Sequence, residues 1–317
     1  SGKKNSNVPS RTSRDGDVFP ELKDAMTDDS SKRVERLTFW QLPIRSELLE
    51  GGITNRNFRV EHGVETFFVR LGEDIPEHSV YRFNELAASR AAFSCGISPE
   101  VVHAESGAMV LRFIEGKTLE SENLRNLSTM GKVVSLLKIC HQEMPQHLPG
   151  STLIFWVFQV LRGYANTLRE GQSRMLPELP RFLGISVDLE KKVGNIEVRF
   201  GHNDLLAGNF IDDGQRLWLI DWDYAGFNSP LFDLANLASN NEFPENLERE
   251  LLEMYFEQAV SLDLWKRYFA MKCASLLREA MWSMVSEIYS TLDFDYVQYT
   301  SINLERFENT YAHFENL

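Results

Sequence analysis

The chain has 317 residues, of which 43% are hydrophobic and 25% are charged. This composition is ordinary for a globular protein with a sizeable core, and the length allows one large domain or two lobes. The formal net charge of −13 argues against nucleic acid or an anionic membrane as a partner, although it suits a cationic ligand.

The three cysteines, Cys95, Cys140 and Cys273, are widely spaced and form no metal-binding or disulfide pattern. We therefore expect buried thiols and a reducing, cytoplasmic location. No apolar run approaches the roughly 20 residues that a membrane-spanning helix needs, and the first residues lack the apolar stretch of a signal peptide. The sequence thus predicts no membrane insertion, and it leaves a homodimer open.

Residues 1–36 are rich in Ser, Asp, Lys and Arg and poor in apolar side chains. We expect a flexible leader here, with folded structure beginning near Leu37. The segment 37–113 then predicts mainly strands with one helix, and 114–317 predicts mainly helices. We interpret these as an N-terminal lobe and a C-terminal lobe of an α+β protein.

A glycine pair opens the first predicted hairpin. Strands are expected over 53–60 and 65–71, with a turn at 62–63 between them. A glycine-containing turn over two strands lets backbone N–H groups approach phosphate oxygens closely. The candidate phosphate-binding residues are Gly51, Gly52, Thr54 and Asn55 in the turn and Arg70 at the end of the second strand.

The next predicted elements are a helix over 80–95, which carries Glu85, and two strands over 101–103 and 108–114. Further on, apolar spacing predicts helices over 128–142 and 153–170, and a short helix over 188–193 leads into a strand over 197–200.

The segment 198–223, VRFGHNDLLAGNFIDDGQRLWLIDWD, carries the clearest chemistry. Asp204 is followed five residues later by Asn209 and twelve residues after that by Asp221, all beside apolar strands. Carboxylates at such places cost stability unless they are paired or hold a metal. One acid can accept a proton from a hydroxyl, while an amide oxygen and a second carboxylate suit Mg²⁺. The alternative is a hairpin whose Asp and Asn side chains only cap turns.

Helices are predicted over 247–260, 265–290 and 301–314 in the last third of the chain. Trp282, Phe294, Tyr299 and Tyr224 could form an aromatic box above Asp204 that holds a quaternary ammonium by cation–π attraction. The alternative is an ordinary aromatic core between the C-terminal helices.

Three short motifs resemble the choline/ethanolamine kinase family, a branch of the aminoglycoside-phosphotransferase-like proteins that share the protein-kinase fold. They are His202-Asn203-Asp204-x4-Asn209, the run 220–226 (IDWDYAG) and the run 233–236 (DLAN). The resemblance implies a two-lobed kinase fold with a small antiparallel-sheet N-lobe, and it implies use of ATP and Mg²⁺.

The resemblance also implies roles for individual positions. Asp204 would be the catalytic base, and Asn209 and Asp221 would bind Mg²⁺. Arg70 stands where protein kinases carry Lys and would be oriented by Glu85. The strand and hinge ending in Arg112, Phe113 and Ile114 would contact adenine.

Further positions are expected to support the loop or depart from the family pattern. His202 and Asp233 are expected to brace the 202–209 loop. Glu279 stands where eukaryotic choline kinases carry a second Trp, and Leu206 stands where they carry Gln. Glu279 could attract a cation that bears N–H groups. With these two departures, the pattern is closer to bacterial or otherwise divergent members of the family.

The sequence therefore predicts ATP- and Mg²⁺-dependent phosphorylation of a small cationic alcohol, with choline first and ethanolamine second. One alternative is another small alcohol, such as an aminoglycoside, thiamine or a sugar. Others are a catalytically silent nucleotide-binding scaffold and a non-enzymatic choline-binding module.

Overall fold

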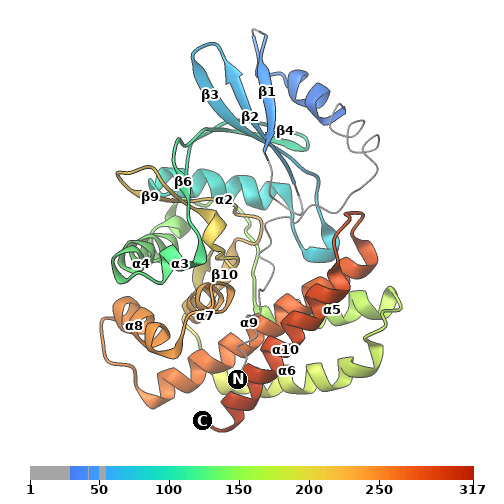
Figure 1. Cartoon of the computed structure of the whole chain (residues 1–317), viewed down its shortest axis with the longest axis vertical. Coiled ribbons are helices and arrows are strands. Elements are labelled where there is room, and N and C mark those ends of the chain that lie inside the picture. The colour runs from blue at the N-terminus through green and yellow to red at the C-terminus, as the bar shows by residue number, and fades with distance from the viewer. Residues whose placement is uncertain (1–28, 42, 50–54) are drawn as a thin grey trace, which may run out of the picture.

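The computed structural model describes residues 29–41, 43–49 and 55–317. It has two lobes, with a sheet at the top and a larger helical region below (Figure 1). The sheet has five antiparallel strands in the order β1-β2-β3-β5-β4. Their bounds are Arg45–Leu49 for β1, Arg56–His62 for β2, Glu65–Leu71 for β3, Val101–Glu105 for β4 and Ala108–Arg112 for β5.

Part of the predicted leader is folded. Residues 29–35 are helical, and Val34 and Leu37 are buried with Phe58 and Phe67 of the sheet. Ordered packing therefore begins before Leu37, because Val34 supplies an apolar contact that the polar composition of this segment conceals.

Helix α2, Arg82–Ser94, lies beneath the sheet and contacts both β4 and the C-terminal lobe (Figure 1). It therefore carries Glu85 into the region between the lobes. A short 3-10 helix, η1 at Pro76–His78, precedes it.

The C-terminal lobe is built around α9, Leu262–Tyr289, which is buried along most of its length and contacts α5, α6, α7 and α10. Such a helix is apolar on nearly all sides because other helices surround it. The other helices of this lobe are α3 at Ser121–Leu124, α4 at Leu127–Gln142, α5 at Val157–Glu170, α6 at Leu179–Val193, α7 at Pro230–Asn240, α8 at Glu245–Phe256 and α10 at Tyr296–Glu315. The remaining 3-10 helices are η2 at Met144–His147, η3 at Leu176–Glu178 and η4 at Ala207–Asn209.

Two small sheets lie between the main sheet and these helices. One pairs β7, Arg199–Gly201, with β10, Gly226–Asn228, and the other has the order β6-β8-β9. The strands of the second are β6 at Lys117–Thr118, β8 at Phe210–Asp212 and β9 at Leu217–Leu219. Asp213 closes the β8–β9 turn by accepting hydrogen bonds from the N–H groups of Gln215 and Arg216, both at 2.8 Å.

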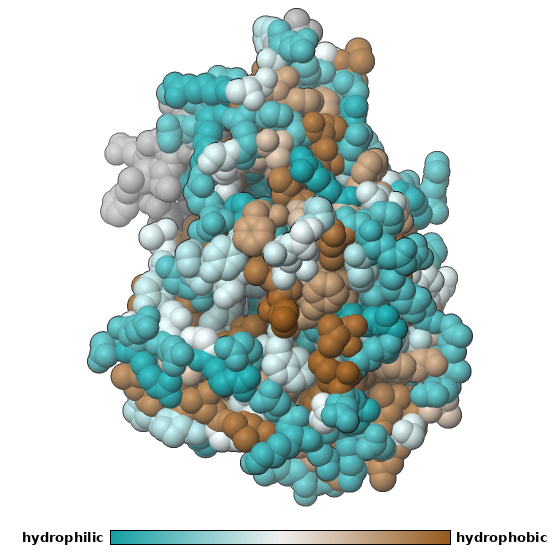
Figure 2. Space-filling model, turned by 180° about the vertical axis from the view of Figure 1, so that it is seen from behind, coloured by the Kyte–Doolittle hydropathy of each residue, from teal (hydrophilic) through white to brown (hydrophobic). Residues whose placement is uncertain are grey.

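On the face opposite to the view of Figure 1, hydrophobic side chains reach the surface near the middle, between more hydrophilic regions (Figure 2). Cys140 and Cys273 are buried thiols, as predicted, whereas Cys95 is partly exposed. None of the helices in the described part of the chain is long and apolar enough to cross a lipid bilayer.

Candidate active site

The β8–β9 hairpin brings the two predicted metal ligands together. Phe210 pairs with Leu219, and the N–H of Ile220 donates to the carbonyl oxygen of Asn209 at 3.0 Å. Asn209 and Asp221 therefore lie at the same end of the hairpin, just beyond its paired strands. Asp221 has a left-handed backbone with φ +70°, which few residues other than glycine adopt. Such strain is concentrated at functional sites, where the surrounding structure holds it in place.

The loop before this hairpin is held from below by α7. Asp233 accepts hydrogen bonds from the backbone N–H groups of His202 and Asn203, at 2.9 and 2.7 Å. His141 donates to the same carboxylate through Nε2 at 2.8 Å. His202 Nε2 donates in turn to the carbonyl oxygen of Ile220 at 2.9 Å. Both predicted bracing roles are thus confirmed, and His141 on α4 supports the Asp233 carboxylate as well.

Four asparagines complete this support. Asn203, at φ +65°, donates through Nδ2 to the carbonyl oxygens of Tyr224 and Gly226, and it accepts from Asn228. The side-chain oxygens of Asn236 and Asn241 accept from the backbone N–H groups of Leu205 and Ala207. A network in which most polar groups find partners makes a rigid support.

Asp204 lies in this loop with its side chain largely buried. The Nδ2 atom of Asn209 donates to the backbone oxygen of Asp204 at 2.8 Å, which ties the predicted base to the predicted metal ligand. Since that nitrogen is engaged, Oδ1 is the Asn209 atom that can face a cation.

Arg70 joins the N-terminal lobe to the hairpin. Its Nη1 pairs with Glu85 on α2, and its Nη2 lies 2.9 Å from Asp221 Oδ1 and 3.2 Å from Asp223 Oδ2. Arg82 contacts the other oxygens of Glu85 and Asp223, at 2.6 and 2.8 Å. The predicted Arg70–Glu85 pair is therefore present, within a larger network of buried charges.

This network holds three carboxylates against two guanidinium groups. Burial and the neighbouring carboxylates of Glu85 and Asp221 raise the pKa of Asp223 to about 7, against the opposing effect of Arg70 and Arg82. Burial also acts to raise the pKa of Asp221, but Arg70, together with His202 and Arg82, holds that pKa below its usual value. The cluster therefore has an excess of acidic groups, which a bound cation would relieve.

The two candidate ligands, Asn209 and Asp221, suit Mg²⁺ better than a metal that is coordinated by protein side chains alone. Within the described residues, no group of three or more His, Cys, Asp or Glu side chains is arranged to hold a metal. Asn209 and Asp221 supply an amide oxygen and a carboxylate. Mg²⁺ is commonly bound by one or two such ligands together with phosphates and water.

The predicted nucleotide residues lie in several places. Gly51, Gly52 and Thr54 lie outside the described residues. Asn55 Nδ2 donates to Asp223 Oδ2 at 3.1 Å, so it joins the charged network. Phe113 and Ile114 line a cavity of about 340 Å³ together with Arg112, whose guanidinium also pairs with Glu65 and Glu100.

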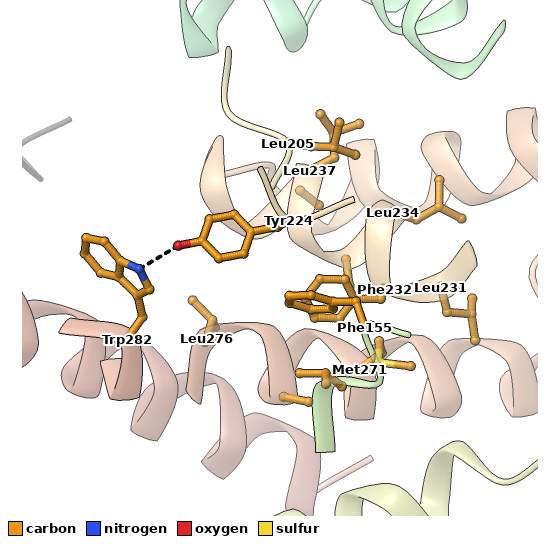
Figure 3. Close-up of a cluster of buried hydrophobic side chains, with 14 of the residues drawn as sticks. Phe155, Leu205, Tyr224, Leu231, Phe232, Leu234, Leu237, Met271, Leu276 and Trp282 are labelled. Atoms are coloured by element: carbon orange, nitrogen blue, oxygen red, sulfur yellow. Dashed lines mark hydrogen bonds between the residues drawn. The ribbon is translucent and has the colours of Figure 1, made fainter. Parts of the chain in front are cut away.

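The predicted aromatic side chains meet between α9, α10 and the segment after β9. Trp282 Nε1 donates to the hydroxyl of Tyr224 at 2.9 Å (Figure 3). The Trp282 and Tyr299 rings lie edge to face at 6.3 Å, and Phe294 lies 5.6 Å from Tyr299. Tyr299 donates to Glu279 Oε1 at 2.7 Å. The structure thus brings these predicted substrate residues into one cluster.

Arg278 was not among the predicted site residues. It is fully buried, and its Nη1 lies 3.3 Å from Glu279 and 3.8 Å from Asp204. Burial favours the neutral form, but the nearby Tyr164 and Tyr224 hydroxyls and the two carboxylates raise the pKa of Arg278. In the sequence, Arg278 stands directly before Glu279 in the helix predicted over 265–290.

Known proteins resemble this chain in sequence and in fold. The family model described as Choline/ethanolamine kinase matches residues 46–255. Protein LicA of Haemophilus influenzae is 28% identical over 217 residues, which cover 66% of this chain and 62% of that protein. This chain therefore spans less than two thirds of that relative. A probable ethanolamine kinase of Arabidopsis thaliana is 27% identical over 287 residues, covering 80% of this chain and 76% of that protein.

Solved structures of other proteins have a similar fold. A choline/ethanolamine kinase family protein from Mesorhizobium loti superposes with a TM-score of 0.71 at 23% identity, covering 90% of this chain and 94% of that one. This confirms the predicted two-lobed kinase fold. Because the family model matches well over half of the chain, the chain belongs to the choline/ethanolamine kinase family, whose members are small-molecule kinases.

Proposed function

We propose that this protein transfers the γ-phosphate of ATP to the hydroxyl of a small alcohol that carries an ammonium group, of the choline and ethanolamine type. The observation that carries this proposal is the junction of Asp204, Asn209 and Asp221 at one end of the β8–β9 hairpin, with Arg70 contacting Asp221 from the N-terminal lobe. These are the parts that phosphoryl transfer uses, since its catalysis is mostly positioning and charge neutralisation.

Asp204 would accept the hydroxyl proton as the alcohol oxygen bonds to the γ-phosphorus and the bond to ADP breaks. Its loop is fixed by Asp233 and the surrounding asparagines, so little reorganisation is needed at that moment. A proton acceptor held in this way contributes typically about 10²- to 10⁴-fold to a rate.

Asn209 and Asp221 would hold Mg²⁺, which when bound neutralises charge on the phosphates. Arg70 would supply a planar pair of N–H donors to phosphate oxygens while Glu85 keeps the guanidinium in place. A solved LicA has been described in complex with AMP, which is in keeping with the use of a nucleotide by this chain.

The acceptor would be recognised by the acidic and aromatic cluster of α9 and α10. Glu279 and Asp204 supply negative charge, and Trp282 and Tyr299 supply ring surface. Such a site favours a compact cation over a large polyhydroxylated ligand, because its side chains are already packed closely together.

A coupled assay of ADP formation tests the proposal. Wild type and Asp204→Ala are assayed with ATP, Mg²⁺ and one acceptor at a time, taken from choline, ethanolamine, a sugar panel and an aminoglycoside panel. We expect turnover that depends on an amino alcohol and is lost in the variant. Turnover with sugars or aminoglycosides alone would contradict the assigned acceptor class, and nucleotide binding without any turnover would support a silent scaffold instead.

A further inference from the structure

Residues 29–40 are folded, but they lie outside residues 46–255, which the family model matches. Residues 29–35 are helical and are shown in Figure 1 as the blue helix beside the sheet of the N-terminal lobe. Side chains of residues 29–40 pack against β3, the strand that carries Arg70. We call these residues the N-terminal brace.

The brace covers the face of the sheet opposite to the Arg70 side chain. Side chains alternate between the two faces of a strand, so Val69 and Leu71, the neighbours of Arg70 on β3, point away from it. Both belong to one buried apolar cluster with Val34 and Leu37 of the brace. Close packing of this kind fixes the backbone on both sides of Arg70.

Aromatic contacts extend the brace along β3. Phe39 and Trp40 lie edge to face against Phe67, with ring centroids 5.3 and 5.7 Å apart. The Nε1 atom of Trp40 donates to the carbonyl oxygen of Val34 at 2.7 Å, which ties the two ends of the brace together. Since Phe67 lies three residues before Arg70, the brace also holds the part of the strand that leads to Arg70.

Arg33 connects the brace to the end of β3. Its Nη2 lies 2.7 Å from Glu73 Oε1 and donates to the carbonyl oxygen of Ser106 at 3.3 Å. Glu73 follows Arg70 by three residues, and Ser106 lies in the β4–β5 turn. Gly107, in the same turn, has φ +69°, and a side chain there would meet both Arg33 and Glu73. The turn is thus shaped to receive the Arg33 guanidinium.

A short path of contacts leads from Glu73 to the charged network of the candidate site. The backbone oxygen of Glu73 accepts a hydrogen bond from Arg82 Nε at 2.9 Å. Arg82 in turn contacts Glu85 and Asp223, which both contact Arg70. A displacement of Glu73 would therefore move the groups that hold the Arg70 guanidinium.

We propose that the N-terminal brace is a positioning element for nucleotide binding, which holds Arg70 in place for the phosphates without contacting the nucleotide itself. This inference rests on the nucleotide-binding part of the proposed function. The apolar contacts of Val34 and Leu37 carry most of the effect, because the Arg33–Glu73 pair is largely exposed and such pairs contribute little.

Nucleotide binding measured without an acceptor tests the brace directly. The Kd of ADP with Mg²⁺ is measured by isothermal titration calorimetry for the full chain and for two variants of Leu37. We expect Leu37→Ala to raise the Kd about threefold or more, because the cavity lets β3 shift. Leu37→Met conserves the side-chain volume and should stay within about twofold of the wild type. Partial unfolding would lower the number of binding sites, whereas a misplaced Arg70 changes the Kd itself.

A matched control is Leu189→Ala, which opens a cavity on α6 in the C-terminal lobe. Its Kd should stay within about twofold of the wild type, because distant sites act independently. An equal rise in Leu37→Ala and Leu189→Ala would show a general loosening of the fold and would overturn the positioning role.

Arg33→Gln tests the brace without disturbing its apolar core, and it serves where Leu37→Ala does not fold. We expect its Kd for ADP to rise about twofold, in line with an exposed ion pair. An unchanged Kd in every folded variant would overturn the brace while leaving the nucleotide site intact. No binding of ADP by the wild type would contradict the proposed function itself, and the brace with it.

Discussion

The Nη2 atom of Arg70, on β3, lies 2.9 Å from Oδ1 of Asp221, which follows β9 and is 151 residues further along the chain. One guanidinium thus connects the sheet of the N-terminal lobe to the proposed metal site. Arg70 is buried, and its Nη1 is held by Glu85. When phosphates and Mg²⁺ bind, we expect Nη2 to exchange its carboxylate partners for phosphate oxygens while the Glu85 contact is kept.

Replacing Arg70 should therefore weaken nucleotide binding more than acceptor binding. We expect Arg70→Met to raise the KM for ATP about tenfold or more, because charge-assisted hydrogen bonds to phosphate are lost. The KM for the acceptor should change much less. Initial rates over a grid of both substrates separate the two effects. An acceptor KM that rises as much as that of ATP would contradict the role given to Arg70.

Asn209 should govern the response to metal. In Asn209→Ala, we expect the Mg²⁺ concentration for half-maximal activity to rise about tenfold or more at saturating ATP, because an oxygen ligand is lost. The measurement is a titration of free Mg²⁺ at fixed nucleotide. Asn240→Ala, at a partly buried asparagine on α7, serves as the control. An unaltered Mg²⁺ dependence in Asn209→Ala would exclude Asn209 as a ligand.

Acid should destabilise the protein in part through Asp233. Burial acts to raise the pKa of this carboxyl, but hydrogen bonds from His141 and the His202 backbone outweigh it and lower the pKa below its usual value. A lowered folded-state pKa contributes stability that is present above the unfolded-state value near 3.9 and is lost as the pH falls below it. Asp233→Asn should lose about 3 kcal/mol of unfolding free energy at pH 7.

Urea unfolding of wild type and Asp233→Asn at pH 7, 4 and 3 measures this contribution. The difference between the two proteins should shrink as the pH falls below about 4, because the carboxyl of the unfolded wild-type chain then binds a proton more readily than that of the folded chain. A difference that stays constant over this range would show that the Asp233 charge does not stabilise the fold.

The hydrogen bond between Trp282 and Tyr224 should be measurable as stability. Tyr224→Phe keeps the ring beneath Arg278 but removes the hydroxyl that accepts the hydrogen bond from the buried indole N–H of Trp282. We expect a loss of about 1–3 kcal/mol in unfolding free energy, measured by urea titration. Tyr289→Phe, at an exposed tyrosine of α9, should change it by less than about 0.5 kcal/mol. Equal effects of the two substitutions would contradict the arrangement.

Strands and helices with clear periodicity were predictable from the sequence. The strand predicted over 65–71 is β3, Glu65–Leu71, and the helix predicted over 128–142 is α4, Leu127–Gln142. The prediction for α6 was wrong at its start, since the observed helix is Leu179–Val193 rather than 188–193. The observed helix has Pro180 in its first turn, where proline is well tolerated although it interrupts helices elsewhere. The edge strand β1, Arg45–Leu49, was missed because it is short and largely polar.

Residues of the candidate site could be predicted where they lie close together in the sequence, but not where they meet only through tertiary packing. Asp204, Asn209 and Asp221 could be predicted because their spacing within one hairpin fixes their proximity. The contact of Arg278 with Tyr224 could not, because it depends on how α9 packs against a segment more than 50 residues away. Likewise, the position of Asp223 between Arg70 and Arg82 depends on how the two lobes meet. Sequence spacing alone does not predict such contacts between distant segments.

The central claim is that this protein phosphorylates the hydroxyl oxygen of an amino alcohol with Asp204 as the proton acceptor. Mass spectrometry of a reaction with ATP, Mg²⁺ and ethanolamine or choline tests it most directly, with Asp204→Asn run in parallel. We predict one phosphoester formed for each ADP in the wild type, and a rate about 10²-fold or more lower in the variant. ADP formed without phosphoester, or equal phosphoester formation in both proteins, would contradict the account.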